Sequence, residues 1–570
     1  MKQIIYFIST LIFVTSCADL DIQPDGRITL ADVFEDETKT EAFLNTVYTF
    51  APAYFWYYTN QSMLAGSSDE AEDSMIGSGA PNINARWIAG GLTPANNPGI
   101  DLYSSMWRGI QHANIFLENI SSVEFEDANR KERLIGEAKI LRAFYYWELV
   151  KQYGPMPIFE KAPDVNFDYS SLSRPEMQDI IDFIVQDCDD AITNMRLPLR
   201  VYYGAEAGRV TRAVAHAIKS QALLYNASPL WNPGNQTEKW KAAADAAKQA
   251  IETLTANDVY KLVDSYGAYF LTGMDYEDNP KDTETILQTS GSGSLFIANH
   301  SIPSRPGGSK AGVCPTQELV DAYEMLETGE PAIVGYEDEE HLIPIINEGS
   351  GYDPKNPYMG RDPRFYETIW YNGALYDNIN GNVHTVETFI GGSDQLLKVP
   401  PYTRNTHTGY YLRKFIDPRI QGTQASTATW KKYRLAELYL NLAEAENELN
   451  GPTQEAYSAV NKIRERAGMK ELPGNLTKDE MRLRIRNERR VELAFEEHRF
   501  WDVRRWKILS QTDKNVTGVE IIKESNNSFV YYRFSLGERN AWQEKFLIFP
   551  IPIGDVSNIP SFNDQQNPGW

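Results

Sequence analysis

Apolar residues recur every three or four positions through most of the first half of the chain and through its last third. This is the spacing of amphipathic helices. It predicts helices over residues 38–50, 101–119, 131–153, 175–194, 211–226, 237–254, 430–449, 453–467 and 477–508. Gly154, followed by Pro155, supplies a stop for the third of these helices. The pattern therefore predicts a mainly α-helical protein.

The predicted helices carry small residues where they would meet. Alanines are frequent in "VTRAVAHAIKSQALLYNASPLW" and in "EKWKAAADAAKQAIETL", and alanines let two helices approach closely. Ala456, Val460, Ile463 and Ala467 are spaced much like the second helix of a tetratricopeptide unit. An irregular helical bundle remains the alternative, because no strict repeat of about 34 residues is visible. We expect tetratricopeptide-like helical hairpins.

The middle of the chain has a different amino-acid composition. Between Tyr260 and Thr429 it is rich in Gly, Pro, Asn, Ser and Tyr, with short candidate strands in "TILQTS" and "RFYETIWYN". We therefore expect one domain over 38–570. A helical scaffold over 38–258 and 430–570 would carry a loop-rich insertion over 259–429 with little β structure. Such an insertion is a common way to build a binding face.

The N-terminus has the pattern of an export signal. Lys2 precedes an apolar run from Ile4 to Val14, which is too short to span a bilayer and stops at Cys17 before a string of acids. This resembles a bacterial lipobox, and each CH₂ group of an acyl chain on Cys17 would add about 0.8 kcal/mol of membrane affinity. We predict a lipoprotein signal over 1–16, acylation of Cys17 and a tether over 17–37. An ordinary signal peptide with an incidental Cys17 is the alternative.

Composition narrows the range of functions. The chain has 570 residues and a formal net charge of −23, which makes it a poor nucleic-acid binder. Beyond Cys17 it has only Cys188 and Cys314, so a disulfide framework is not expected, and Cys188 has the helical spacing of a small core residue. No other stretch is long and apolar enough to span a membrane, so we expect membrane contact through the lipid alone.

The last predicted helix contains "MRLRIRNERRVELAFEEHRFWDVRRW", whose arginines are interleaved with acids. Arg489 with Glu492 and Asp502 with Arg505 have the spacing of ion pairs on one helix. Val491, Ala494, Phe495, His498 and Trp501 fall on one face. We expect a packed, ion-paired helix in which His498 is a structural residue and not a catalyst.

Several of these stretches together have a family resemblance. They are "GEAKILRAFYYWELVKQYGPMPI", "RDPRFYETI", "YRLAELYLNLAEAENEL", "NERRVELAFEEHRFWDVRRW", "FLIFPIP" and the closing "QNPGW". In this order they resemble the SusD-like (RagB/SusD) family over essentially the whole mature chain. One departure is Glu497, which stands where the family usually has a glycine after "AFE".

The resemblance implies a function without catalysis. SusD-like proteins are outer-membrane lipoproteins of Gram-negative glycan users, with tetratricopeptide-like hairpins and an irregular binding face. They capture oligosaccharides, or sometimes peptides, above a SusC-like TonB-dependent transporter and act as its lid. The resemblance therefore implies a cell-surface protein anchored through Cys17, with that transporter and a glycan as partners and with no cofactor.

A secreted glycoside hydrolase is the main competing class, since it needs only two carboxylates about 5 to 9.5 Å apart. With 78 acidic residues some pair will meet that test by chance. Zinc-protease, nucleophile-elbow and phosphate-loop motifs are absent, and "DYEDNPKD" has Pro280 where a calcium loop needs glycine. We expect a protein that is not an enzyme, and the sequence names no metal ligands. A metal held by irregular loops remains the alternative. A purely structural envelope protein, a third class, would have no saturable ligand.

A sugar site needs flat aromatic platforms with polar groups beside them. Two loop regions have both, residues 54–97 and the insertion. The candidate platforms are Trp87 and Phe296, followed by Trp56 and Trp370, and the candidate partners for sugar hydroxyls are Asp69, Arg86 and Arg305. For each aromatic residue, packing in the core is the alternative.

Overall fold

The structure is a computed structural model. It describes residues 29–52, 62–75, 83–96, 102–202, 206, 208–271, 282–288, 299–305, 308–377, 383–398, 404–418 and 429–570. The predicted signal, Cys17 and the tether up to residue 28 lie outside these ranges.

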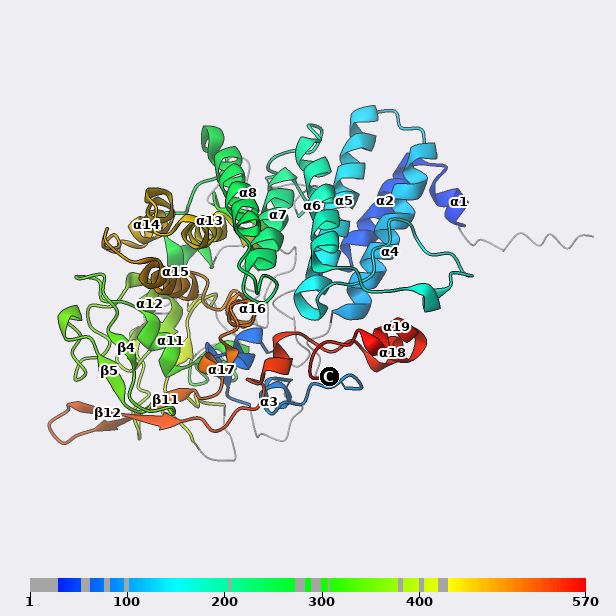
Figure 1. Cartoon of the computed structure of the whole chain (residues 1–570). Helices are drawn as coiled ribbons and strands as arrows, with labels where there is room; N and C mark the ends of the chain where they lie inside the picture. The colour runs from blue at the N-terminus through cyan, green and yellow to red at the C-terminus, as the bar shows by residue number, and fades with distance from the viewer. Residues whose placement is uncertain are drawn as a thin grey trace, which may run out of the picture.

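Helices dominate the described part of the chain and form one layer, seen in the upper half of Figure 1. The long helices are α2 (Glu37–Tyr48), α4 (Tyr103–Asn119), α5 (Ala128–Tyr153), α6 (Met177–Thr193), α7 (Arg212–Ala227), α8 (Thr237–Thr255), α13 (Leu435–Asn450), α14 (Gln454–Ala467) and α15 (Lys478–Glu492). From α4 to α8 each helix packs on the next in sequence, and α13 then packs on α8 and α14 on α13. The prediction of a mainly α-helical fold is confirmed.

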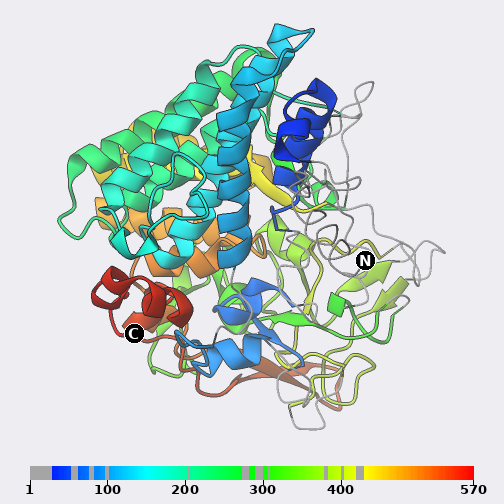
Figure 2. The same ribbon diagram turned by 90° about the vertical axis from the view of Figure 1, so that its right-hand side faces the viewer.

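The other α-helices of the described segments are short. They are α1 (Leu30–Val33), α3 (Ile83–Ile88), α9 (Tyr266–Tyr269), α11 (Gln317–Ala322), α12 (Pro363–Thr368), α16 (Arg499–Arg505), α17 (Leu509–Thr512), α18 (Ile553–Asn558) and α19 (Pro560–Asp564). Most lie in the lower half of Figure 1, among the strands. Figure 2 shows α18 and α19, in red, below the layer of long helices.

The strands of the described segments form six antiparallel pairs. The pairs are β1 (Ala71–Asp73) with β3 (Val313–Pro315), β2 (Thr285–Gln288) with β10 (Lys431–Arg434), β4 (Ile333–Tyr336) with β5 (Pro344–Ile346), β6 (Ile369–Trp370) with β9 (Tyr411–Leu412), β7 (Leu375–Asp377) with β8 (Val383–Thr385), and β11 (Thr517–Lys523) with β12 (Phe529–Ser535). The small amount of β structure agrees with the prediction. The placement of the insertion boundaries at 259 and 429 stays a prediction.

Local sequence signals explain where the helices end. Gly154 and Gly451 follow α5 and α13 with φ of 73° and 87°, a conformation that glycine adopts without a steric penalty. Thr477 and Glu480 form a capping box at the start of α15. The predicted close packing of alanines is present, since Ala243, Ala247 and others on α8 are buried. Cys188 is a buried free thiol of α6, as predicted.

Three predicted elements are wrong in part. The helix predicted over 430–449 begins at Leu435, because residues 431–434 pair with β2 as strand β10. "RFYETIWYN" was predicted as a strand, but its first residues lie in α12, which Asp362 caps and in which Pro363 is the first residue. The helix predicted over 477–508 is broken between α15 and α16.

This break depends on two residues with left-handed backbone. Phe495 and Glu497 have φ of 61° and 68°, a region costly for residues other than glycine. Tertiary hydrogen bonds hold them there. The Phe495 N–H donates to Glu70 Oε1 at 3.2 Å, and Glu497 Oε1 accepts from the Leu64 N–H at 2.9 Å. A positive φ explains why a glycine suits the position of Glu497.

The first prediction concerns Glu497. Burial raises the pKa of its carboxyl from 4.5 to about 8, and the charge of Glu70 adds to the shift. The bound proton therefore stabilises the fold fully below pH 4.5, and this contribution is lost as the pH rises through about 8. Glu497→Gln keeps an acceptor for the Leu64 N–H and removes the ionisation. Thermal melts should show the variant above the wild type at pH 9, with the difference vanishing toward pH 5.

The control is Glu339→Gln, because the Glu339 side chain is 82% exposed. Its melting temperature should follow that of the wild type over the same range. A constant difference between Glu497→Gln and the wild type at every pH would contradict a protonated, buried Glu497.

Candidate functional site

Trp87 lies in the core. It is the fifth residue of α3 and is 0% exposed. Its ring meets the rings of Phe500 and Phe549 at centroid distances of 5.3 and 5.2 Å, and the Arg504 guanidinium lies 5.3 Å from its centroid. The Trp87 ring, which the sequence predicted as a stacking platform for a sugar, is therefore covered by other protein groups. Trp87 has a packing role in this structure.

Trp370 and Arg305, from the insertion, are also engaged by protein groups. Trp370 is 1% exposed in β6 and packs on Tyr376 at a centroid distance of 4.9 Å. Arg305 donates to Asp394 Oδ2 at 2.6 Å and to the Thr385 carbonyl at 3.1 Å. The protein therefore covers the Trp370 ring, and Asp394 and the Thr385 carbonyl engage Nη2 of Arg305.

Asp69 forms part of a buried ion-pair cluster. The Arg499 guanidinium donates to both of its carboxylate oxygens at 2.8 Å, and Arg490 lies 2.8 Å from Oδ2. Burial alone would raise the pKa of Asp69, but the charges of Arg490 and Arg499 outweigh it and hold the pKa at about 2. Asp69 is therefore committed to these arginines rather than to a ligand.

The other predicted residues divide into two groups. Arg86, beside Trp87, is exposed. Trp56 and Phe296 lie outside the described residues. Among the residues that the structure describes, the predicted set is not gathered into one site: Asp69 and Trp87 pack against the terminal helices, and Arg305 and Trp370 lie within the insertion.

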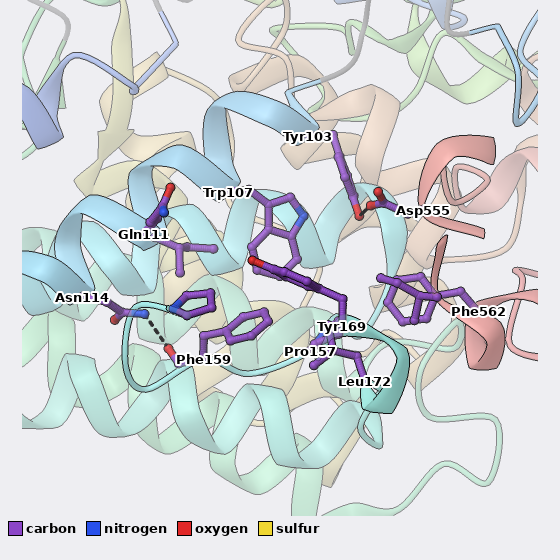
Figure 3. A pocket seen from close by; sticks show the side chains of 13 residues that line it. Tyr103, Trp107, Gln111, Asn114, Pro157, Phe159, Tyr169, Leu172, Asp555 and Phe562 are labelled. Carbon is purple, nitrogen blue, oxygen red and sulfur yellow. Dashed lines mark hydrogen bonds between the residues drawn. The ribbon is translucent and has the colours of Figure 1, made fainter. Parts of the chain in front are cut away.

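A different part of the molecule forms a cavity of about 220 Å³ with aromatic walls, which we call the aromatic pocket (Figure 3). Three segments line it: the face of α4 from Tyr103 to Asn114, the loop residues 157–172, and the C-terminal residues 555–562. The cavity is below the range of about 300 to 1,000 Å³ typical of sites for drug-sized ligands. It therefore suits a group about the size of one ring.

Helix α4 supplies the first wall because Tyr103, Trp107, Gln111 and Asn114 are spaced four, four and three residues apart, on one helical face. Trp107 is half-buried and packs nearly perpendicular to Phe159, at a centroid distance of 5.8 Å. Gln111 is exposed at the edge of the cavity.

The loop between α5 and α6 supplies the second wall. Phe159 is fixed through its backbone: its N–H donates to the Tyr146 hydroxyl at 2.7 Å, and its carbonyl accepts from Asn114 Nδ2 at 2.8 Å. Tyr169, further along the loop, is 47% exposed and also lines the cavity. A fixed ring and a solvent-facing ring thus stand on the same wall.

The C-terminal helices supply the third wall. The Tyr103 hydroxyl donates to Asp555 Oδ2, which joins this wall to α4, and Phe562 lies on the same side as Asp555 (Figure 3). Arg174 holds the chain end by donating to the Gln565 carbonyl at 2.6 Å and to Asn567 Oδ1 at 2.9 Å. The closing "QNPGW" therefore helps to brace the pocket.

The chemistry of the aromatic pocket is stacking combined with hydrogen bonding. Among its lining residues Asp555 alone carries a formal charge, and Gln111 and Tyr169 add exposed polar atoms. Sequence reasoning did not find this pocket, although the partly exposed aromatic face of α4 was a signal for it. Its other two walls come from distant segments that no local pattern joins.

The described residues give no metal-binding cluster: no group of three or more His, Cys, Asp or Glu side chains is placed to hold an ion. In the same residues, no helix has the length and hydropathy to cross a membrane.

Comparison with known proteins gives family matches over most of the chain. A family model described as "SusD family" matches residues 272–570, and one described as "Starch-binding associating with outer membrane" matches residues 20–224. A SusD-like protein of Formosa agariphila is 24% identical over 501 residues, which cover 82% of this chain and 79% of that protein.

Solved structures share the fold. A SusD-like protein from Bacteroides fragilis has 25% identity and a TM-score of 0.76, with 97% of this chain and 100% of that chain covered. A SusD-like carbohydrate-binding protein from the same species has 24% identity and a TM-score of 0.70, with 93% and 99% covered. The similarity therefore spans the scaffold and the middle of the chain alike.

The second prediction tests the packing role of Trp87. Trp87→Ala should lower the free energy of unfolding by about 3 to 5 kcal/mol, because it leaves a cavity among Phe500, Phe549 and Arg504. The neighbouring Arg86→Ala should change it by less than about 0.5 kcal/mol, since Arg86 is exposed. Chemical denaturation measures both. Equal stability of the two variants would contradict the buried position of Trp87.

Proposed function

We propose, from the premise that this chain belongs to the SusD family, that it captures oligosaccharides at the cell surface and passes them to a SusC-like TonB-dependent transporter, for which it acts as a lid. The family consists of binding proteins without catalysis, in agreement with the prediction that the chain is not an enzyme. The observation that carries the proposal is the match to the SusD family model. The likeness to a solved SusD-like structure supports it, because that likeness covers 97% of this chain.

Carbohydrate is the ligand class that the comparisons favour. The family model matched by residues 20–224 is described as starch-binding, and one protein with the same fold is named as carbohydrate-binding. The aromatic pocket offers stacking surfaces with polar groups beside them, which is what sugar rings require. A peptide ligand is the alternative within the same family, and it becomes an outcome of the binding test below.

The proposed location is the outer membrane of a Gram-negative bacterium, facing the cell exterior. The description of the second family model, which names association with the outer membrane, supports this location. We propose that acylated Cys17 holds the protein there. The tether predicted over 17–37 would act as the leash that lets a lid open without leaving its transporter. Its last residues belong to the folded body, because Leu30–Val33 form α1 and Phe34 is buried.

For the main glycan-binding face, we keep the two loop regions of the sequence as the proposal, with Trp56 and Phe296 as its platforms. Both residues lie outside the described part of the chain. We do not include Trp87, Trp370 and Asp69 in the proposed face, because other protein groups cover these side chains.

The third prediction concerns the anchor. Cys17→Ala should abolish incorporation of labelled palmitate and release the protein from the membrane fraction, because a thiol is the acyl acceptor. The control is Ser16→Ala, which keeps Cys17. A Cys17→Ala protein that still takes up palmitate and stays with the membrane would contradict the lipobox.

The fourth prediction tests ligand and partner together. Purified protein should be retarded in native gels that contain a matching polysaccharide, and the polysaccharide should be recovered intact. A SusC-like transporter should co-purify in mild detergent, since a closed lid must bury a sizeable interface. If no polysaccharide of a broad panel retards the protein and peptides bind saturably, the proposed ligand is a peptide and not a glycan. Shortened glycan products would contradict a pure binder.

A further inference from the structure

We infer that the aromatic pocket is a separate carbohydrate site that holds one uncharged pyranose ring. This inference rests on the proposed function, because it assumes that the chain binds glycans. It adds a second contact point outside the loop regions proposed for the main face: the pocket is lined by residues 103–172 and 555–562, and none of its lining residues comes from residues 54–97 or from the insertion over 259–429.

The size of the cavity limits what can enter. About 220 Å³ leaves room for a single ring and not for an extended chain. Trp107 and Tyr169 line the cavity from different walls, so a sugar ring inside it can contact either aromatic side chain (Figure 3). The site thus suits a terminal or branching sugar unit rather than the middle of a linear chain.

Charge limits the class of sugar. Asp555 is the charged residue of the lining, and its Oδ2 already accepts from the Tyr103 hydroxyl. Its Oδ1 remains as an acceptor for a sugar hydroxyl. A uronate or sulfate group in this cavity would meet the Asp555 carboxylate with no cationic lining residue to offset it. The pocket should therefore select neutral sugars over acidic ones.

Hydrogen bonds within the protein hold parts of all three walls in place. Phe159 is held through both backbone groups, and Tyr103 and Asp555 bond across two walls. Asn567 donates to the Tyr153 and Phe549 carbonyls at 2.9 and 2.6 Å, which fixes the chain end behind α19. Because little ordering is needed on binding, a small ligand can be held by few contacts.

The test follows Trp107 itself. Full-length protein labelled with 5-fluorotryptophan is titrated with methyl glycosides of neutral hexoses and, separately, with methyl glucuronide. The Trp107 resonance in the ¹⁹F spectrum is assigned by its loss in Trp107→Phe. It should shift saturably with at least one neutral glycoside, and the glucuronide should bind at least about threefold more weakly.

Variants distinguish binding in the aromatic pocket from binding elsewhere on the protein surface. Tyr169→Ala should weaken the binding of the neutral glycoside by about three- to tenfold. Tyr532→Ala, on β12, removes a tyrosine that is 53% exposed and lies outside the pocket, and it should have no effect. Asp555→Asn should reduce the discrimination against the glucuronide. A melting temperature equal to that of the wild type shows that Tyr169→Ala remains folded.

The outcomes separate the two proposals. If polysaccharide still retards the protein in native gels but no neutral glycoside moves the Trp107 resonance, the pocket inference is overturned and the proposed function stands. Equal effects of Tyr169→Ala and Tyr532→Ala would likewise overturn the pocket. If no glycan binds in either experiment, both proposals fail.

Discussion

Buried arginines that share the glutamates of α15 are the constraint on which the rest of the structure depends. Arg364, from the insertion, lies 2.6 Å from Glu488 and 2.9 Å from Glu492, and Arg434, at the end of β10, lies 2.7 Å from Glu492. Arg464, from α14, lies 2.9 Å from Glu488. Removing one partner of such a pair leaves an uncompensated buried charge, at a cost of about 3 to 5 kcal/mol. The glutamates therefore join the insertion and two scaffold elements into one unit.

The same kind of contact explains which surfaces remain for a ligand. Asp69 is held by Arg490 and Arg499, so the polar stretch around it is an internal joint between the N-terminal loop and the terminal helices. In the sequence, the acidic residues of this stretch resemble partners for sugar hydroxyls. The arginines that pair with them are far away in the sequence, so no local pattern predicts the pairing. The aromatic pocket lies outside this network, and its Tyr169 and Gln111 still face solvent.

Sequence reasoning succeeded where structure is decided locally. The stop at Gly154 and the apolar helical spacing predicted the long helices closely. It failed at Phe495 and Glu497, which stand among good helix formers and are turned into left-handed backbone by contacts with Glu70 and Leu64. Likewise, the Asp502–Arg505 pair is present at 2.8 Å, but Arg489 pairs with Asp502 instead of Glu492. Pairing across the fold overrode pairing along the helix.

The central claim of the account is that the glutamates of α15 hold the insertion and the scaffold together as one unit. Amide hydrogen exchange of Arg364→Met tests it most directly, because the variant removes a single arginine at the junction. The account predicts faster exchange in both α12 and α15, two elements far apart in the sequence, while α5 keeps its protection. Faster exchange confined to α12, with α15 as protected as in the wild type, would contradict it.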